Sequence, residues 1–407
     1  MRLLLIGATT GYQTRVFAEV AARLGYALVL ATDRCHILDD PWADQAVALR
    51  FENPDGAAET LAAEAGVTGI VAVGDRPAYI AALAAGRLGI PYNSPDSVQA
   101  AGNKFLARER FRKAGLLVPD YRRISLADDP ETAARETRYP CVLKPLGLSA
   151  SRGVIRANHR AEFAAAFRRI EALLADPDIA RLREDFDHYL QVESFIEGRE
   201  FALEGILTRG RLRVLALFDK PDPLDGPYFE ETIYVTPSRE DAAVQLEIVS
   251  TTEAAIHALG LTHGPIHAEM RVNSRGVWML EVAARPIGGL CARVLPGLEE
   301  LILRYAAGED IEQFPMPADA GGVMMIPIPR EGIYVNLEGL EEARAVPGIE
   351  DIVITAKAGQ KLVPLPEGNS YLGFIFARSA SPDFAERALR TAHDRLHFEI
   401  ATALPVV

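Results

Sequence analysis

The feature that most constrains the fold is the stretch Val142–Val154, where two β-like runs flank a flexible loop. Lys144 stands at the end of the first run, and the loop that follows is rich in glycine, serine and alanine. Small residues let backbone N–H groups approach an anion closely, and a lysine ammonium suits a phosphate group. The stretch therefore predicts a phosphate-covering loop in a β-hairpin. A solvated turn beside an ordinary strand lysine is the alternative, and this stretch alone does not decide between them.

The N-terminus alternates between apolar strands and a helix. Residues 1–6 form an apolar run, a turn at Gly7–Gly11 leads into helical spacing, and Ala27–Ala31 is the next strand-like run. This βαβ order predicts a parallel, doubly wound sheet. The turn lacks the complete G-x-G-x-x-G pattern, so we do not expect it to bind a dinucleotide. Asp75 and Arg76 follow a later buried run and either contact a substrate or cap the strand.

Two further segments have readable patterns. Residues 97–114 read as one helix that carries Asn103 and Lys104. Residues 333–401 read in the order β-α-β-β-α-β, which is the split βαβ pattern. We therefore expect the end of the chain to form a small, separate α+β unit.

A second hairpin places two glutamates on neighbouring strands. If Ser274–Gly276 is a three-residue turn that ends in a left-handed glycine, Asn273 pairs with Val277 and Glu269 lies directly opposite Glu281. Like charges in this arrangement destabilise a strand pair, so we expect a cation between them. Mg²⁺ held together with substrate phosphates suits such carboxylates. A register shifted by one residue would instead send the two acids to opposite faces.

Composition excludes some classes of partner. The net charge of −13 argues against nucleic acid or an anionic membrane as partner, because either would need a basic face. The sequence has no apolar run long enough for a membrane span or a signal peptide. Three dispersed cysteines fit a reducing compartment. We therefore expect a cytoplasmic protein that acts on small molecules.

The motifs gain meaning from their order. Two lysines, the flexible loop, an acidic stretch at Glu193–Glu200, the diglutamate hairpin and Arg285 follow one another in a way that resembles the ATP-grasp superfamily over roughly residues 1–310. The resemblance implies an ATP-grasp fold of mixed α/β and α+β class. Its implied domains are a Rossmann-like (pre-ATP-grasp) domain at 1–100, a central and lid subdomain at 101–195, a C-terminal ATP-grasp subdomain with the metal-binding hairpin at 196–310, and a small α+β subdomain at 311–407.

The resemblance implies an ATP site with distinct parts. Lys104 and Lys144 match the two lysines that contact phosphates. The remaining implied contacts are a loop closing over the γ-phosphate (Ser149, Ser151 and Gly153), a connector whose backbone reads adenine while an apolar side chain packs on the ring (Glu193, Ser194, Phe195 and Ile196), and an acid on the ribose hydroxyls (Glu200).

It also implies a metal and a catalytic group. Glu269 and Glu281 match two ligands of Mg²⁺ (or Mn²⁺), whereas Ala283 stands where many members carry an asparagine ligand. Arg285 would stabilise an acyl phosphate and the oxyanion that follows, whereas Lys104, Lys144 and the metal would neutralise charge during phosphoryl transfer. His267 is either a base or substrate contact, or an ordinary strand histidine.

Within the superfamily, the chain resembles the L-amino acid ligases. This rests on Arg285–Gly289 and on the C-terminal unit with Gly368–Ala377. The implied function is an ATP-dependent carboxylate–amine ligase that joins amino acids or small peptides through an acyl phosphate and releases ADP and phosphate. The alternatives are a purine-pathway ligase or carboxylase that acts on a phosphoribosyl substrate, and a nucleotide-binding module without catalysis. A homodimer is implied by analogy only.

Overall fold

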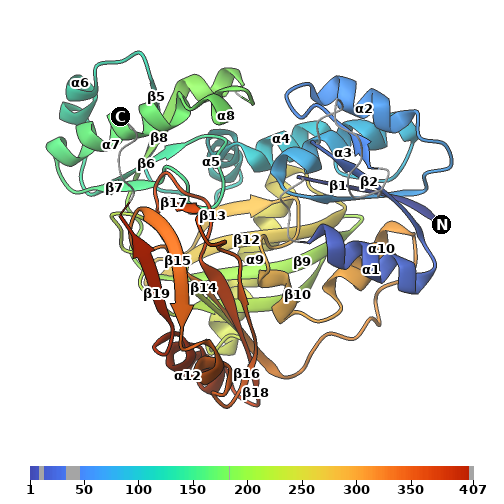
Figure 1. Ribbon diagram of the computed structural model, residues 1–407. Helices are drawn as coiled ribbons and strands as arrows, with labels where there is room; N and C mark the ends of the chain where they lie inside the picture. The colour runs from blue at the N-terminus through green and yellow to red at the C-terminus, as the bar shows by residue number, and fades with distance from the viewer. Residues whose placement is uncertain (9–12, 34–45, 183, 403–407) are drawn as a thin grey trace.

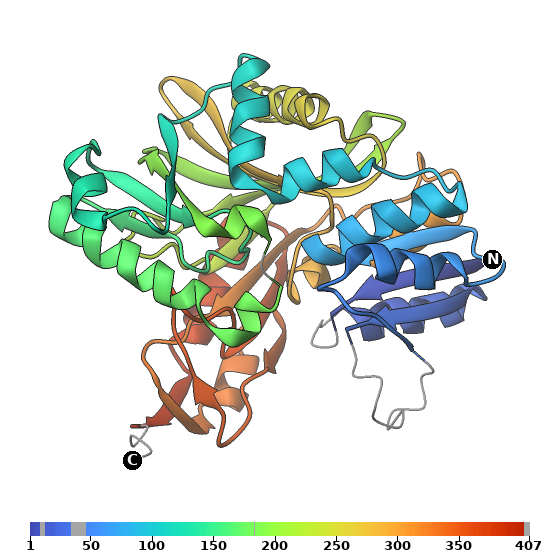
Figure 2. The same ribbon diagram turned by 90° about the horizontal axis from the view of Figure 1, so that it is seen from above.

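The computed structural model describes residues 1–8, 13–33, 46–182 and 184–402. In Figure 1 the N-terminal unit lies at the upper right and a lid unit (residues 121–194) at the upper left. A large central sheet runs below both and continues into the C-terminal strands at the lower left. Seen from above in Figure 2, the lid unit and the N-terminal unit lie on opposite sides of the molecule. The turn predicted at Gly7–Gly11 falls largely outside the described residues.

The N-terminal unit is a parallel sheet, as the βαβ order predicted. Alternate side chains of its first strand enter two different hydrophobic clusters, so both faces are covered by helices, as parallel sheets require. The sheet order is β3-β2-β1-β4, and the elements are β1 (Arg2–Gly7), α1 (Thr14–Leu24), β2 (Ala27–Thr32), β3 (Val47–Ala48), α2 (Pro54–Ala62), β4 (Gly69–Val73) and α3 (Asp75–Leu88).

The helix predicted over residues 97–114 is in fact two helices, α4 (Pro95–Gly102) and α5 (Lys104–Lys113). Asn103 lies between them in an extended conformation, and its side-chain oxygen accepts hydrogen bonds from the N–H groups of Phe105 and Leu106 at 3.1 Å each. Asparagine competes well for such a capping position, which is why it ends one helix and begins another. The break puts Lys104 at the first position of α5.

The lid unit is a four-stranded antiparallel sheet in the order β5-β8-β6-β7, covered by one long helix. The hairpin predicted around Val142–Val154 is present as β6 and β7. Aromatic and aliphatic side chains of the long helix, including Phe163 and Phe167, bury this sheet. The elements are β5 (Tyr121–Ser125), α6 (Pro130–Arg135), β6 (Cys141–Pro145), β7 (Ile155–Ala157), α7 (Arg160–Leu174), α8 (Pro177–Ala180), η1 (Asp185–His188) and β8 (Tyr189–Ser194).

The central sheet has eight strands in the order β13-β12-β9-β10-β11-β14-β18-β16. It carries most of the charged side chains described below. Its strands and the helices beside them are β9 (Arg199–Thr208), β10 (Arg211–Lys220), β11 (Ile233–Thr236), α9 (Ala242–Leu259), β12 (Gly264–Asn273), β13 (Gly276–Ala283), η2 (Cys291–Val294), α10 (Leu298–Ala306), β14 (Ala320–Ile326), β16 (Ile349–Ile354) and β18 (Gly373–Ser379).

The end of the chain has the predicted order of elements but not the predicted sheet. A split βαβ unit would pair its strands with one another; instead β16 and β18 extend the central sheet, and only β15 (Gly332–Glu338), β17 (Lys361–Leu362) and β19 (His397–Ala401) form a small sheet. The reason is burial on both faces of β18, where Phe374 and Phe376 join one hydrophobic cluster and Ile375 joins another. Two helices complete this region, α11 (Leu340–Arg344) and α12 (Pro382–His393).

No helix in the described part of the chain is both long enough and apolar enough to cross a membrane.

Candidate active site

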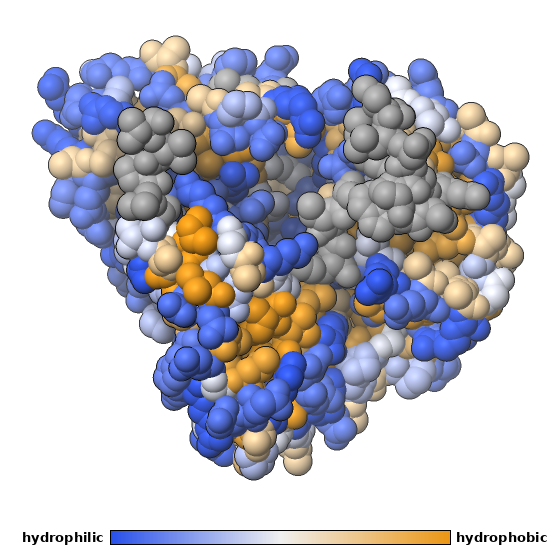
Figure 3. All heavy atoms as spheres, in the orientation of Figure 1, coloured by the Kyte–Doolittle hydropathy of each residue, from blue (hydrophilic) through white to orange (hydrophobic). Residues whose placement is uncertain are grey.

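A cavity of about 430 Å³ lies between the lid unit, the N-terminal unit and the central sheet. Figure 3 shows a hollow near the centre of this face, with hydrophilic residues around much of its mouth and an apolar area below it. Every site residue predicted from the sequence except Gly153 lines the cavity. These residues are Lys104, Lys144, Ser149, Ser151, Glu193, Ser194, Phe195, Ile196, Glu200, His267, Glu269, Glu281 and Arg285.

One side of the cavity, the lid wall, is lined by Lys104, Lys144 and Glu193 and includes Arg108, which is buried against Glu193. The Nζ atom of Lys144, on β6, lies 2.6 Å from Oε2 of Glu193 on β8. Arg108 lies one turn after Lys104 on α5; its Nε lies 2.6 Å from Oε1 of Glu193, and the arginine side chain is only 1% exposed. Lys104 donates from Nζ to the carbonyl oxygen of Leu148 at 2.5 Å. Both predicted lysines therefore project toward one place, beside the phosphate loop.

Glu193 has a different environment from the one expected for an adenine-reading residue. Burial alone would raise its pKa, but the charges of Arg108 and Lys144 outweigh that effect and lower the pKa of Glu193 to about 2. Burial lowers the pKa of Lys144 despite this partner. The Phe195 N–H is also engaged, as it donates to the carbonyl oxygen of Pro140 at 3.1 Å. The Glu193 carboxylate thus organises the cations of the lid wall, and the Phe195 ring remains for packing.

The phosphate loop is left-handed at two residues that are not glycine. Ala150 and Ser151 have φ values of 56° and 54°, which cost free energy for residues with a Cβ. Gly153 also has a positive φ of 73°, and a Cβ there would lie 2.7 Å from Cγ of Pro145. Its N–H donates to the carbonyl oxygen of Pro366 at 2.8 Å, so this group is turned away from the predicted phosphate.

On the opposite side, the sheet wall is lined by Glu200, Glu231, Glu269, Arg271 and Glu281 and includes Lys220, which is buried among its acids. The predicted pairing of Glu269 with Glu281 is present, but the turn and the register of the hairpin differ from the prediction. Asn273 pairs with Gly276, so the turn holds only two residues, and a bulge after Met279 shifts the register by one. The two differences cancel, and both glutamates line the cavity.

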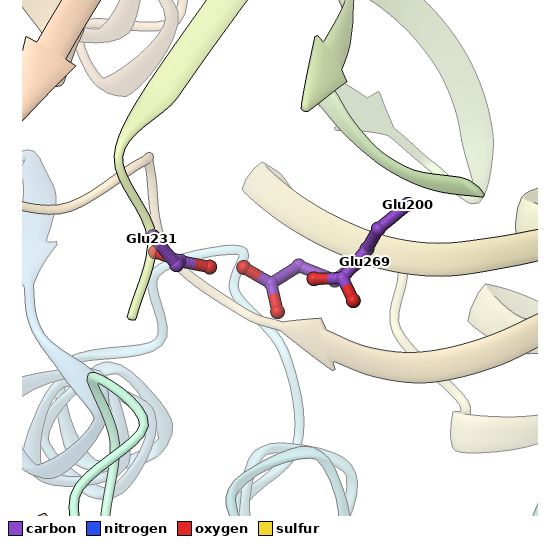
Figure 4. A group of neighbouring side chains, drawn as sticks. All are labelled: Glu200, Glu231 and Glu269. Carbon is purple, nitrogen blue, oxygen red and sulfur yellow. The ribbon is translucent and has the colours of Figure 1, made fainter. Parts of the chain in front are cut away.

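Lys220, at the end of β10, lies among three carboxylates. Its Nζ is 2.9 Å from Glu200, 2.6 Å from Glu231 and 3.1 Å from Glu269. Figure 4 shows the carboxylates of Glu231 and Glu269 turned toward each other with that of Glu200 beside them. Burial alone would lower the pKa of Lys220, but these carboxylates raise it well above its usual value. The lysine therefore acts as the internal cation of this cluster.

The three acids of this cluster could also surround a metal ion, since their oxygens lie within 4.8 Å of one another. The Nζ atom of Lys220 already contacts all three of these acids. Glu281 differs because no described residue forms an ion pair with it, although it lies opposite Glu269 and lines the cavity. Carboxylate oxygens suit Mg²⁺, so the donor set fits this ion best at Glu269 and Glu281, on the cavity side of Lys220.

His267 uses both ring nitrogens in contacts with carboxylates. Nδ1 lies 3.1 Å from Glu204 and Nε2 lies 3.3 Å from Glu269. Burial favours the neutral ring, but the two acids outweigh it and raise the pKa of His267 to about 9. The other Glu204 oxygen accepts the N–H of Ile287 at 3.0 Å. His267 thus connects the Glu269 carboxylate to the loop that begins at Arg285.

Arg285 approaches the N-terminal unit. Its Nε donates to Oδ1 of Asp75 at 2.9 Å, and Asp75 opens helix α3. Burial alone would lower the pKa of Arg285, but Asp75 and then Glu281 raise it. Asp75 lines the cavity, as one reading of the sequence expected. Arg76 forms an ion pair with Glu184 and does not line it in the described structure.

An aromatic pair marks one region of the cavity. The rings of Phe195 and Phe229 stack with centroids 6.4 Å apart, and the guanidinium of Arg156 lies 4.0 Å from the Phe195 centroid. Arg271 pairs with Glu200 at 2.8 Å and lies 5.2 Å from the same ring. A flat aromatic group with polar edges would find both stacking surface and hydrogen-bonding partners here.

Sequence reasoning did not single out Arg108, Glu204 or Lys220. It left open whether Tyr228–Glu231 faces a substrate or only crosses the surface, and Phe229 and Glu231 line the cavity. Arg108 follows Lys104 by one helical turn, so helical spacing could have indicated it. Lys220 precedes the Pro/Gly-rich connector Pro221–Pro237 and Glu231 lies within it, and the sequence there offers no period that aligns their side chains. The pairing of β9, β10 and β12 brings Lys220 to Glu200 and Glu269, and Glu231 precedes β11, which pairs with β10.

Comparison with known proteins defines the class. Residues 137–294 match the ATP-grasp domain family. This part of the chain is an ATP-grasp domain, and the predicted ATP-grasp fold class is confirmed.

The C-terminal region narrows this assignment, because residues 324–401 match L-amino acid ligase C-terminal domain 2. An L-amino acid ligase from Bacillus licheniformis has the same fold with a TM-score of 0.84 and 27% identity, with 99% of each chain covered. Alanine–anticapsin ligase of Bacillus subtilis is 27% identical over 220 residues, which are 51% of this chain and 46% of that protein. The chain spans about half the length of such curated relatives. Phosphoribosylglycinamide synthetase from Anaerococcus prevotii, at 17% identity, a TM-score of 0.69 and coverage of 98% and 99%, shares the fold alone.

Proposed function

We propose that this chain is an ATP-dependent carboxylate–amine ligase that joins two amino acids or small peptides and releases ADP and phosphate. One observation carries the proposal: the lid wall and the sheet wall present opposite net charge across a single cavity. MgATP has anionic phosphates that suit the first wall and a cation that suits the second. The L-amino acid ligase domain at residues 324–401 favours amino acid substrates over a phosphoribosyl substrate.

In the first step, a substrate carboxylate oxygen attacks the γ-phosphorus and ADP leaves, which gives an acyl phosphate. Phosphoryl transfer depends mainly on positioning and on neutralising charge. Lys144 and Lys104 would contact the phosphates, and Ser149 and Ser151 would cover them. Glu193 holds Lys144 in place before the nucleotide binds.

The base and ribose would lie beyond the phosphates. Phe195 and Phe229 would pack on the adenine ring, and Glu200 would accept from the ribose hydroxyls while Lys220 and Arg271 fix its two oxygens. Mg²⁺ held by Glu269 and Glu281 would supply positive charge near the phosphate oxygens.

In the second step, the neutral amine nitrogen bonds to the acyl carbon, the bond from that carbon to the phosphate oxygen breaks, and the leaving phosphate takes up the amine proton. Arg285 would stabilise the oxyanion of the tetrahedral intermediate, and its pairing with Asp75 fixes the direction of the guanidinium. His267 is held between two carboxylates and is better suited to orient Glu269 than to take the amine proton.

The far end of the cavity supports an apolar side chain on one substrate. Burial, and then the charge of Glu231, raises the pKa of both Cys291 and Tyr371, so Glu231 adjoins this end. An acid beside an apolar wall can accept from the ammonium of an amino acid whose side chain packs on that wall. The apolar wall consists of Tyr234, Ile287, Cys291, Met325, Tyr371 and Phe374.

The test is phosphate release from ATP and Mg²⁺, with amino acids added singly and in pairs and products identified by mass. We expect release to require a pair, and the rate to rise along a side-chain series from alanine to leucine and phenylalanine in one of the two positions. Release that depends only on a phosphoribosyl amine would favour the alternative ligase. ATP binding without release in any mixture would favour a non-catalytic module.

A further inference from the structure

The segment between β17 and β18 lies against the phosphate loop. We call residues 363–371 the strap. The Gly153 N–H donates to the carbonyl oxygen of Pro366 at 2.8 Å, and Arg152 Nε donates to the carbonyl oxygen of Glu367 at 2.7 Å. In Figure 1, β17, which precedes the strap, lies just below the strands of the lid unit. The end of the phosphate loop, at Arg152 and Gly153, is thus hydrogen-bonded to the C-terminal region.

A side-chain pair reinforces this contact. Both Nε and a terminal nitrogen of Arg169, on α7, contact the carboxylate of Glu367, the latter at 2.8 Å. Another terminal nitrogen of Arg169 donates to the Tyr228 hydroxyl at 2.5 Å. This is a bidentate arginine–carboxylate pair, in which two parallel hydrogen bonds fix the relative orientation of the two groups. The pair ties the helix of the lid unit to the strap.

The pair is placed where it can open. Arg169 is 42% exposed and Glu367 is 35% exposed. Exposed pairs contribute little to global stability, so this one has little value as a structural clamp for the whole fold. It can bias a local equilibrium between a closed and an open phosphate loop. Such a bias matters here because Ala150 and Ser151 hold left-handed conformations that relax when outside contacts are lost.

The strap also reaches the cavity. Asn369, Ser370 and Tyr371 line it, as do Ser149 and Ser151 of the phosphate loop. The strap itself is a tight turn: the Gly368 N–H donates to the Pro364 carbonyl oxygen at 2.9 Å, and a Cβ on Gly368 would lie 1.8 Å from the Val363 carbonyl oxygen. A rigid turn that contacts the loop on one side and the substrate end on the other can transmit position between them.

We propose that Glu367 and Arg169 are positioning residues which, through the strap, hold the Ser149–Gly153 loop closed over bound nucleotide. For its effect on product formation this inference rests on the proposed function; for nucleotide retention it requires only that the protein bind ATP or ADP. When the loop opens early, water replaces the amine at the acyl carbon. The acyl phosphate then returns to the free carboxylate and phosphate, and ADP forms without a condensed product.

The test compares Glu367→Gln and Arg169→Gln with Arg168→Gln. Arg168 is the next residue of the same helix, and it pairs with Glu131 at 2.9 Å at similar exposure but within the lid unit. The dissociation rate of a fluorescent ADP analogue with Mg²⁺ is measured by stopped flow. We expect it to rise about two- to fivefold in the first two variants, which is the weight of one exposed pair, and to stay unchanged in the third.

A charge exchange provides the rescue. The double variant Glu367→Arg/Arg169→Glu restores the pair with its partners reversed, and we expect its dissociation rate to return toward that of the wild type. In the ligase assay, the ratio of ADP to condensed product rises in the two single variants and falls again in the exchange variant. A merely structural role would not move this ratio.

The outcomes separate the two proposals. Nucleotide binding with the same dissociation rate in Glu367→Gln, Arg169→Gln and wild type overturns the positioning role and leaves the ligase function standing. Faster dissociation in the Arg168→Gln control as well would also overturn it, because the effect would then belong to the helix surface in general. A wild type that binds no adenine nucleotide overturns the proposed function itself.

Discussion

The two walls of the cavity are built from the same residue types but in opposite balance. On the lid wall three cations, Lys104, Arg108 and Lys144, face one buried acid, Glu193. On the sheet wall two cations, Lys220 and Arg271, face four acids. Burying a charge costs free energy unless an opposite charge compensates it, so the cations of the lid wall pair with Glu193 and the acids of the sheet wall pair with Lys220 and Arg271. The net charge that remains is positive on the lid wall and negative on the sheet wall.

This difference explains why one ligand can satisfy both walls. Phosphate groups neutralise the net positive charge of the lid wall, and a divalent cation neutralises the net negative charge of the sheet wall. His267 with Glu204, and Arg285 with Asp75, are balanced locally and leave the contrast unchanged. The same contrast predicts that the two buried lysines respond differently to removal.

The largest effect is expected for Lys220→Met. It leaves Glu200, Glu231 and Glu269 buried without their common cation, so the free energy of unfolding should fall by about 4 kcal/mol. Urea unfolding in a chelator measures this, and added Mg²⁺ should restore part of the loss. The matched control is Lys361→Met, which breaks an exposed pair with a distance of 2.9 Å. If wild type and Lys220→Met were equally stable, Lys220 would not be the cation that compensates the buried acids of the sheet wall.

Lys144→Met should show the reverse pattern. Glu193 keeps Arg108, so the free energy of unfolding should change by less than about 1 kcal/mol. The rate of ADP release should fall by about 10²- to 10³-fold because a positioned cation is lost from the transferring phosphate. Lys113→Met, at the end of the same helix that carries Lys104, is the control. A variant that loses stability but keeps its rate would mean that Lys144 is structural.

Glu193→Gln removes the negative charge of the lid wall, and its effect on the free energy of unfolding should depend on pH. The pKa of Glu193 is lowered to about 2 in the folded state, so its contribution is present above the unfolded pKa and is lost as pH falls through the folded value. At pH 7 the variant should be less stable than wild type by about 3 kcal/mol. The gap, measured by urea unfolding, should narrow by about 1.4 kcal/mol per pH unit below about pH 4.5. A gap that stays constant down to pH 3 would contradict this assignment.

The smallest effect is expected for Glu281→Gln. Glu281 lies on the cavity side of the sheet wall without an ion pair in the described structure, so its loss should leave folding almost unchanged. The Mg²⁺ concentration for half-maximal ADP release should rise about tenfold, which corresponds to about 1.4 kcal/mol. Glu253→Gln, on the exposed face of α9, is the control. An unchanged Mg²⁺ requirement would move the metal site to the Lys220 cluster.

Local pattern was sufficient for the parts of this molecule that lie close together in sequence. The βαβ start and the hairpin around Lys144 follow from alternation, turn residues and short loops. The pairing of Glu269 with Glu281 was predicted correctly because an error in the turn and a missed bulge cancel. Even there, the sequence pattern did not predict the helix cap at Asn103 or the bulge after Met279. Each depends on local hydrogen bonds rather than on a repeating spacing of apolar residues.

The amino-acid sequence alone indicated the order of most elements, the ATP-grasp fold class and a set of site residues of which all but Gly153 line the cavity. Which of these residues touch one another depends on how distant elements pack. Arg285 meets Asp75 across 210 positions, Arg152 meets Glu367 across 215, and Lys220 meets its three acids through the pairing of separate strands. The physical reason is that backbone period sets the direction of a side chain along its own element, whereas the partner of a buried charge is set by desolvation, which acts only after distant elements have packed.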